Sequence, residues 1–364
     1  MDGAMLVSSS TLMPSLSPNA TDPYSNVTTV SILKACVLGI VAVLVLIGNT
    51  MCLIVLRNTE NGVHPVTKLF LVSLTLSDLL VGLLVCVPVI GSTALQRWPY
   101  GETYCYVVAM CHALYFNAGL SVLAINIERY IAVVWPLRYP TIVTVHRAIV
   151  VEVFLLAMIV IWALLYLLVP GRSTFYYENF SACFIDADSG DDYLGQLGMT
   201  LFIAVPMLVT VILHARLFFL ATRHASRVDA ITIGDINPPA TIDVESNSDP
   251  AESSPSRRNG PRRQRANSVR NNPDAKAAMT FFIMAVVAGV SWTPYYTTIA
   301  WENFRTEPVP PAVAFVSQIL LLLNSLWNVV IYYTRNDTFR KTSNKLFGRC
   351  FRVRTSREEL LAVS

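Results

Sequence analysis

Residues 120–134, Leu-Ser-Val-Leu-Ala-Ile-Asn-Ile-Glu-Arg-Tyr-Ile-Ala-Val-Val, set the charged step Glu128-Arg129-Tyr130 into an otherwise apolar run. This run is the third of seven in a chain of 364 residues that is 54% apolar and only 14% charged. A soluble domain carries about 25% charged residues, so the apolar excess indicates a membrane protein. Because the backbone N–H and C=O groups at an open strand edge find no hydrogen-bond partners in lipid, each run is predicted to be a helix.

Each apolar run is long enough to cross a bilayer. About 20 helical residues span the hydrocarbon core, and every run exceeds that length. The predicted fold is an all-α membrane protein, a seven-transmembrane helix bundle followed by a short C-terminal interfacial helix. The predicted spans are residues 32–56, 68–92, 104–134, 148–170, 193–221, 275–300 and 311–334.

The basic residues predict how the bundle is oriented. Of the 27 Lys and Arg residues, all fall on one side of the spans except Lys34, Arg97, Arg172 and Arg305. Basic residues gather on the cytoplasmic side of membrane proteins, so we expect a multi-pass plasma-membrane protein with its N-terminus outside. Residues 1–30 hold no Lys or Arg and the first run is too long for a signal-peptide core, so the first span is expected to act as an anchor.

Three regions follow from this arrangement. Residues 1–31 form a predicted disordered outer tail, residues 32–334 a membrane domain, and residues 335–364 a cytoplasmic interfacial helix and tail. A polar loop at about 223–274, rich in Pro, Asn, Ser and Arg, is also predicted to be disordered. Glycosylation patterns that fall on the outer side begin at Asn19, Asn26 and Asn179.

Two groups of cysteines carry separate predictions. Cys105 at the outer end of the third span and Cys183 in the following outer loop both face the oxidising side, so a disulfide between them is expected. After the seventh span, Phe339, Leu346 and Phe347 share one helical face with Cys350. An acyl chain on Cys350 would reach the bilayer lipid; an unmodified thiol is the alternative.

Polar residues recur at one depth of three spans. Asp78 lies in the middle of the second span, where a bare carboxylate needs partners or a cation. Four further polar side chains lie at comparable depth in the first and seventh spans: Asn49, Asn324, Ser325 and Asn328. The cluster predicts either a sodium site, the one candidate metal or cofactor in the chain, or a structural hydrogen-bond network around a protonated acid.

The third and sixth spans hold the residues that predict movement. Pro294 removes a backbone hydrogen bond and clashes with the preceding turn, so the sixth span is expected to kink and to swing its inner end. At that end, a charged bridge from Arg129 to Asp274 would hold the bundle closed and would free Arg129 for a partner on opening. A static kink and a snorkelling Glu128–Arg129 pair are the alternatives.

Together these motifs resemble a rhodopsin-family (class A) G-protein-coupled receptor over the whole chain except its tails and long inner loop. The residues that carry the resemblance are Gly48-Asn49, Leu76-Ser77-Asp78-Leu79, Trp98-Pro99-Tyr100-Gly101 before Cys105, Glu128-Arg129-Tyr130, Trp162, Pro206, Trp292-Thr293-Pro294, and Asn324-Ser325 through Asn328 to Tyr332. The resemblance implies an extracellular ligand and a heterotrimeric G protein, with arrestin and receptor kinases as further partners. It implies switch roles for Glu128, Arg129, Tyr130, Asp274, Pro294 and Tyr332.

The resemblance also implies a ligand pocket in the outer halves of spans three, five, six and seven. The chain offers six residues there: His112, Tyr115, Trp292, Tyr295, Tyr296 and Gln318. Aromatic walls with few polar groups suit a small or mid-sized organic ligand, and Tyr faces can hold a cation. We expect an amine-like or other small organic ligand, with a peptide or a lipid-like molecule as alternatives.

Four positions depart from the family pattern. The resemblance is nearest to amine-type receptors, but His112 stands where these carry an aspartate. The other three departures are Val329 for proline in the seventh span, His214 for tyrosine in the fifth, and Ala288 for phenylalanine below Trp292. They predict activation that is weak, constitutive or differently wired.

Other function classes fit the sequence less well. A transporter or channel, the main alternative, needs a continuous polar path and is often built from repeats, yet His112 is the main ionisable group outward of Asp78 and no internal repeat is found. A membrane hydrolase needs clustered histidines and acids, and the five histidines are scattered. We therefore expect neither an enzyme nor a nucleic-acid-binding protein.

Overall fold

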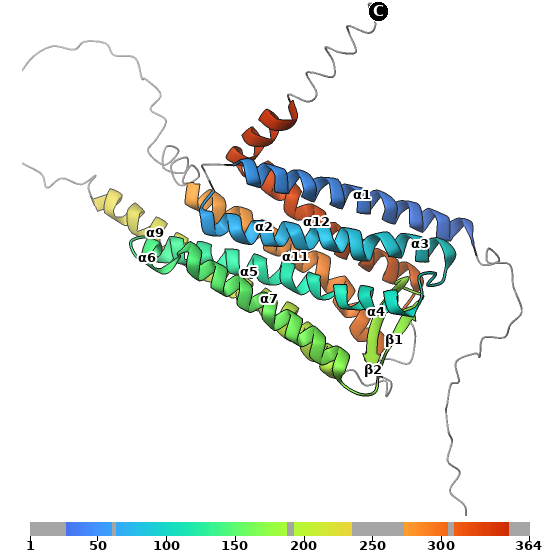
Figure 1. The fold of residues 1–364 in the computed structure, drawn as a ribbon. Helices are drawn as coiled ribbons and strands as arrows, with labels where there is room; N and C mark the ends of the chain where they lie inside the picture. The colour runs from blue at the N-terminus through green and yellow to red at the C-terminus, as the bar shows by residue number, and fades with distance from the viewer. Residues whose placement is uncertain (1–26, 60–62, 188–192, 235–272, 305–308, 349–364) are drawn as a thin grey trace, which may run out of the picture.

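The computed structural model describes residues 27–59, 63–187, 193–234, 273–304 and 309–348, which form a bundle of long helices running between two ends (Figure 1). We call the end that carries the hairpin of β1 and β2 the outer end, and the opposite end the inner end. By length and composition, six helical segments of the described residues qualify as membrane spans. The sixth predicted span lies in a seventh long helix, α11, so the seven-helix bundle is confirmed.

The helices follow the predicted spans closely. Their bounds are α1 Thr29–Asn58, α2 Pro65–Val81, η1 Gly82–Cys86, α3 Val87–Leu95, α4 Glu102–Cys111, α5 Ala113–Val134, α6 Tyr139–Ile142, α7 Val145–Leu168, α8 Tyr193–Met199, η2 Thr200–Ala204, α9 Val205–Gly234, α11 Pro273–Phe304 and α12 Pro311–Arg335. Because α9 continues to Gly234, it overlaps the start of the loop predicted at about 223–274. Residues 235–272 lie outside the described part of the chain.

Spans two and five each contain a widened π turn just before a proline. The π-helix η1 precedes Pro88, and η2 precedes Pro206. Proline lacks an N–H and crowds the carbonyl four residues earlier, so a wider turn at that point relieves the clash and reshapes the helix. In span six the helix α11 runs through Pro294 without interruption.

Span three is divided near its outer end. The helix α4 ends at Cys111 and α5 begins at Ala113, with His112 between them. The His112 Nδ1 lies 2.9 Å from the Val108 carbonyl oxygen. A ring that bonds the backbone of the preceding turn competes with the regular helical pattern there, which accounts for the local break.

A β-hairpin covers the outer end, and the sequence reading did not predict it. Strand β1 Arg172–Tyr177 pairs antiparallel with β2 Ala182–Ala187. Its strands are rich in aromatic and β-branched residues, which favour strands, and Ser181 takes the left-handed conformation in the connecting turn. Outside the hydrocarbon layer, water can satisfy a strand edge, so the restriction that makes the spans helical does not apply.

Residues 337–348 form the predicted helix after the last span. Asn336 caps it by accepting a 2.9 Å hydrogen bond from the Phe339 N–H. Phe339 is buried, Leu346 and Phe347 are half-buried in the same apolar cluster, and Lys341 and Lys345 are exposed. The predicted apolar face therefore packs on the inner end of the bundle.

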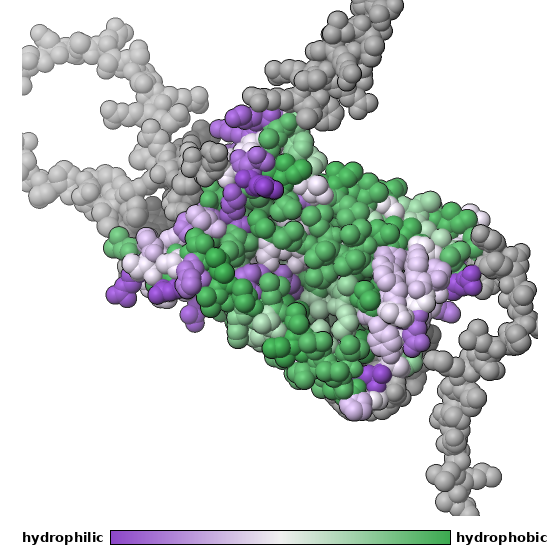
Figure 2. Space-filling view, viewed as in Figure 1, coloured by the Kyte–Doolittle hydropathy of each residue, from purple (hydrophilic) through white to green (hydrophobic). Residues whose placement is uncertain are grey.

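Apolar side chains face both inward and outward along the spans. Two buried clusters fill the bundle, one in its outer half around Trp292 and Tyr295 and one in its inner half around Met284 and Tyr332. Figure 2 shows one face that is hydrophobic across its middle and hydrophilic toward both ends. Exposed apolar side chains on a long helix are expected where the solvent is lipid.

Candidate ligand cavity, polar cluster and inner switch

A cavity of about 310 Å³ opens between the hairpin and the outer halves of the helices. Five of the six residues predicted to line a ligand pocket border it: His112, Tyr115, Trp292, Tyr295 and Tyr296. At its base the rings of Tyr115 on α5 and Trp292 on α11 meet edge to face, with centroids 5.6 Å apart. None of the described residues that border the cavity is Asp, Glu, Lys or Arg.

His112 offers the cavity a polar atom of defined character. A carbonyl oxygen only accepts hydrogen bonds, so the Nδ1 that faces the Val108 oxygen is the protonated nitrogen. In the neutral ring Nε2 then carries the lone pair. The ring also contacts Phe184 of β2, with centroids 4.7 Å apart.

Gln318, the sixth predicted pocket residue, does not border this cavity. Its Nε2 donates a 2.7 Å hydrogen bond to the Phe180 carbonyl oxygen at the hairpin turn. The Phe180 side chain is fully buried and packs against Tyr295, with ring centroids 5.4 Å apart. The protein's own hairpin thus occupies the part of the bundle that Gln318 faces.

The predicted disulfide anchors that hairpin. Cys105 at the start of span three is bonded to Cys183 on β2, and their Cα atoms lie 5.4 Å apart. In the turn, Asn179 is half-buried beside Phe180. Asn19, Asn26 and Cys350, predicted to be modified, lie outside the described residues.

At mid-depth, Asp78 is buried and held by two of its four predicted partners. Ser325 donates to Asp78 Oδ1 over 2.7 Å and Asn328 to Oδ2 over 3.2 Å. Asn49 donates to the Ser325 carbonyl oxygen, and the buried Oδ1 of Asn49 has no hydrogen-bond partner. Asn324, also predicted here, has an unpartnered Oδ1 and borders a second cavity below Trp292.

A second buried carboxylate lies within the spans and was not predicted from the sequence. Glu152 in span four is only 8% exposed and accepts a hydrogen bond from Ser73 on α2. Ser73 in turn accepts from Asn117 on α5 over 3.0 Å, so the carboxylate links three spans. An acid inside an otherwise apolar run was the signal that could have identified it.

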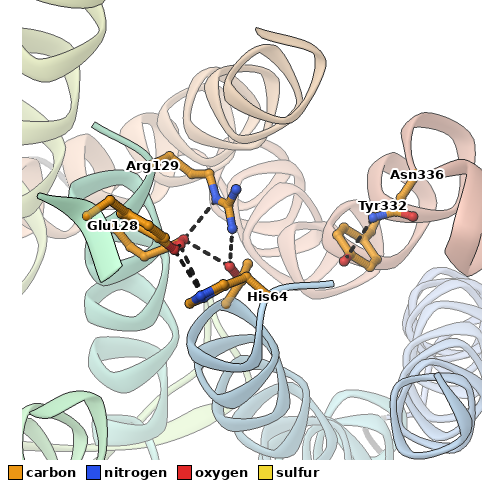
Figure 3. A network of polar contacts seen from close by, with 7 residues as sticks. His64, Glu128, Arg129, Tyr332 and Asn336 are labelled. Atoms are coloured by element: carbon orange, nitrogen blue, oxygen red, sulfur yellow. Dashed lines mark hydrogen bonds and ion pairs between the residues drawn. The ribbon is translucent and has the colours of Figure 1, made fainter. Parts of the chain in front are cut away.

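At the inner end, Arg129 is held by α2 and by its own neighbour (Figure 3). Its Nε donates to Glu128 Oε2 over 2.8 Å, and its Nη2 donates to the Thr67 hydroxyl. Thr67 also donates to Glu128 Oε2 over 2.9 Å. The predicted partner Asp274 lies in the first turn of α11, and its side chain is outside the described part of the structure.

Glu128 is the centre of this network. Its other oxygen accepts a hydrogen bond from the Tyr139 hydroxyl, and His64 Nδ1 lies 3.8 Å from it. Burial lowers the pKa of His64, and the nearby charges act in opposite directions, Glu128 raising it and Arg129 lowering it. Nothing in the sequence indicated that three residues would contact Glu128, because these contacts depend on how the helices pack. The three are Thr67, His64 and Tyr139.

Two further predicted switch residues lie nearby but outside the Arg129 network. Tyr332 is buried, accepts a 3.0 Å hydrogen bond from Asn336 and packs against Phe339 (Figure 3). Tyr130 is half-buried and contacts Trp135 edge to face. Trp162, quoted above for the resemblance, packs against Phe202 of span five.

Comparison with known proteins agrees with this architecture. The human G-protein coupled receptor 161 is 28% identical over 329 residues, which cover 88% of this chain and 59% of that protein. The mouse alpha-1A adrenergic receptor is 27% identical, covering 94% and 74% of the two chains, and the chicken thyrotropin-releasing hormone receptor is 26% identical, covering 90% and 80%. The chain thus spans less than two thirds of the length of the first of these relatives.

A solved structure shares the fold. Squid rhodopsin superposes with a TM-score of 0.69 at 18% identity, covering 88% of this chain and 86% of that one. The family described as 7 transmembrane receptor (rhodopsin family) matches residues 48–332, a range that holds the outer cavity, the Asp78 cluster and the inner network. The chain is therefore a member of the rhodopsin family of seven-transmembrane receptors, a family of G-protein-coupled receptors and not of enzymes.

Proposed function

We propose that the chain is a plasma-membrane receptor that binds an extracellular ligand in its outer cavity and activates a heterotrimeric G protein at its inner end. The observation that carries this proposal is the Tyr115–Trp292 contact at the base of the cavity. Tyr115 lies on α5, the helix that also carries Arg129, and Trp292 lies on α11 two residues before Pro294. A ligand that moves either ring acts on both helices.

The cavity favours a small, mostly apolar ligand with an aromatic or cationic part. Its ring-lined wall suits apolar and aromatic groups. The Nε2 of His112 can accept a hydrogen bond from the ligand, and the Tyr295 and Tyr296 faces can hold a weakly hydrated cation. An amine, a small neutral organic molecule or the end of a peptide can meet these groups; no carboxylate on the described cavity wall selects for an amine.

Ligand binding would be transmitted by a shift in population between closed and open inner ends. In the closed form Arg129 is bound to Glu128 and Thr67. A ligand that prefers the open form shifts the equilibrium only by its difference in affinity for the two forms. In the open form Arg129 would be available to the G protein, and arrestin and receptor kinases would act on the same inner surface and on the segments 235–272 and 349–364.

The Asp78 cluster suits a sodium ion. Hard cations bind oxygen ligands, and here the Asp78 carboxylate, the Ser325 hydroxyl and the unpartnered Asn49 Oδ1 are available. The ion would neutralise a buried carboxylate and so favour the arrangement that surrounds it. Asn324 and Asn328 remain proposed ligands of this ion. Glycans on Asn19, Asn26 and Asn179 and an acyl chain on Cys350 are proposed as covalent modifications.

Ligand-dependent nucleotide exchange in reconstituted membranes tests this function. The purified chain would be placed in lipid nanodiscs with a panel of G proteins and screened against amine, organic and peptide ligands. We expect a ligand that accelerates exchange with the unmodified chain and has no effect with Arg129→Ala, while still binding to that variant. Transport of a solute without any exchange would instead support the transporter alternative.

A further inference from the structure

A second cavity, of about 260 Å³, lies inward of Trp292 between α5, α9 and α11. It opens sideways, because three of its lining residues are exposed apolar side chains within the spans. Val211 is 65% exposed, Val286 48% and Phe282 40%. At that depth of a membrane-spanning bundle the surrounding solvent is lipid, so the cavity is accessible from the bilayer.

Small residues create the space. Gly119 on α5 and Ala285, Ala288 and Gly289 on α11 all border the cavity. Ala288 is the position at which the family pattern led us to expect phenylalanine. Protein interiors are normally packed to high density, and atoms that line an unfilled space lose their contact partners, so an apolar occupant is favoured.

The cavity is elongated along the bundle. Its lining on α11 runs from Phe282 to Trp292, which corresponds to about 15 Å at 1.5 Å per helical residue. None of the described lining residues is Asp, Glu, Lys or Arg. The shape and lining therefore suit one apolar body of about that length, and they offer no counter-ion for a charged headgroup.

The inner end of the cavity carries one polar ring, which is paired with a buried amide behind the cavity wall. His214 borders the cavity, and its Nε2 lies 3.1 Å from Asn126 Oδ1. Asn126 is 1% exposed, and its Nδ2 is buried without a hydrogen-bond partner. Asn126 is three residues from Arg129, about 4.5 Å along α5, so the pair lies close to the inner surface of the membrane.

The second ring nitrogen of His214, Nδ1, is complementary to a hydroxyl group. With the amide oxygen toward His214, Nε2 donates, leaving an acceptor at His214 Nδ1 and a donor at Asn126 Nδ2. With the amide reversed, His214 Nδ1 becomes the donor and the Asn126 oxygen the acceptor. His214 Nδ1 is therefore an acceptor in one assignment and a donor in the other, and a hydroxyl, which both donates and accepts, can bond it in either.

We propose that this cavity binds a neutral lipid of the inner leaflet that carries a single hydroxyl on an apolar body, with the hydroxyl on His214 and the body extending toward Trp292. Such a lipid enters with its polar end at the membrane surface, as it already lies in the leaflet. Sterols and diacylglycerols share this chemistry. Phosphatidylcholine does not, because its headgroup is zwitterionic and carries no hydroxyl.

Photo-labelling of the full-length chain in nanodiscs tests the proposal. Three probes with a photoreactive group in the apolar part would be compared at equal mole fraction: a sterol, a diacylglycerol and a phosphatidylcholine. We expect the sterol or the diacylglycerol to label α9 and α11 peptides that line the cavity at least fivefold above phosphatidylcholine. Which of the two labels identifies the lipid class.

Matched variants separate the cavity from the general lipid surface. Ala288→Phe fills the space and should reduce this labelling at least fivefold, whereas Ala157→Phe, on the lipid-exposed surface of α7, should leave it unchanged. The ring centroids of His214 and Phe282 lie 5.0 Å apart, so His214→Phe keeps a ring against Phe282 but removes the polar contact. In this variant about ten times more unlabelled lipid should be needed to displace the probe. Equal labelling by all three probes, or labelling unchanged in both cavity variants, would overturn the proposal.

Discussion

At the scale of single residues, the inner network depends on a hydroxyl that the sequence did not mark. Thr67 receives a hydrogen bond from Arg129 and donates one to Glu128. Thr67→Val keeps the shape of the side chain and removes both bonds. Hydrogen bonds to charged groups contribute roughly 1.5–3 kcal/mol, part of which the remaining Glu128–Arg129 pair retains, so we expect ligand-independent nucleotide exchange to rise about threefold to tenfold.

Thr75→Val is the matched control for that measurement. Thr75 lies on the same helix and is equally buried, but its hydroxyl donates to the Leu71 carbonyl oxygen and takes no part in the Arg129 network. Basal exchange in Thr75→Val should equal that of the unmodified chain. If both variants rise together, the effect comes from a weakened helix and not from the release of Arg129.

His64 should make the inner network sensitive to acid. Its pKa lies below the ordinary value of 6.5, chiefly because burial disfavours the charged ring, although Glu128 opposes this effect. The unfolded chain therefore takes up a proton at a higher pH than the folded chain, and folding stability falls as the pH drops below about 6.5. We expect the melting temperature of the unmodified chain to fall further between pH 7.5 and 5.5 than that of His64→Gln; equal losses would contradict this role.

A site residue could be predicted from the sequence where its role follows from its own segment, and could not where its role depends on a contact with a distant segment. Asp78 was identifiable because a carboxylate in the middle of an apolar run needs partners wherever it packs. Thr67 was not, because one more threonine at the start of a helix has no distinguishing neighbour in the sequence. Gln318 was expected to face a ligand, but the Phe180 carbonyl that it bonds is separated from it by 138 positions, a contact that the sequence does not show.

At the scale of elements, the spans were predictable and the hairpin was not. Length and apolarity define a lipid-crossing helix almost completely. The hairpin residues 172–187 carry no such constraint, and their form depends on the disulfide to α4 and on the space into which Phe180 fits. The π turns η1 and η2 were likewise beyond the sequence, because Pro88 and Pro206 do not by themselves fix the geometry of the turns before them.

The buried turn makes the hairpin a stabilising element. Phe180→Ala removes a fully buried ring from between Tyr295 and Phe184, and buried Phe→Ala changes cost about 3–5 kcal/mol. We expect a clear loss of melting temperature in detergent. Phe175→Ala, on β1 where the side chain is only half-buried, should cost much less, and a loss equal to that of Phe180→Ala would argue that the turn is not seated in the bundle.

At the scale of the whole molecule, the distribution of basic residues and the fold predict the same orientation in the membrane. The end that carries Arg129 and the helix of residues 337–348 is the end with the excess of basic residues, whereas the hairpin end carries few. Because basic segments near the spans stay in the cytoplasm, the hairpin and its disulfide should face the oxidising exterior, where that bond persists.

Accessibility of the two termini in intact cells measures this orientation. An epitope placed before residue 27 should bind antibody without permeabilisation, and one placed after residue 348 should bind only after it, as an odd number of spans requires. Cys105→Ser should remove the disulfide and lower the amount of the N-terminal epitope at the surface, whereas Cys36→Ser, at an exposed cysteine of α1, should not. Detection of both epitopes on the same side would exclude a seven-span bundle inserted in this way.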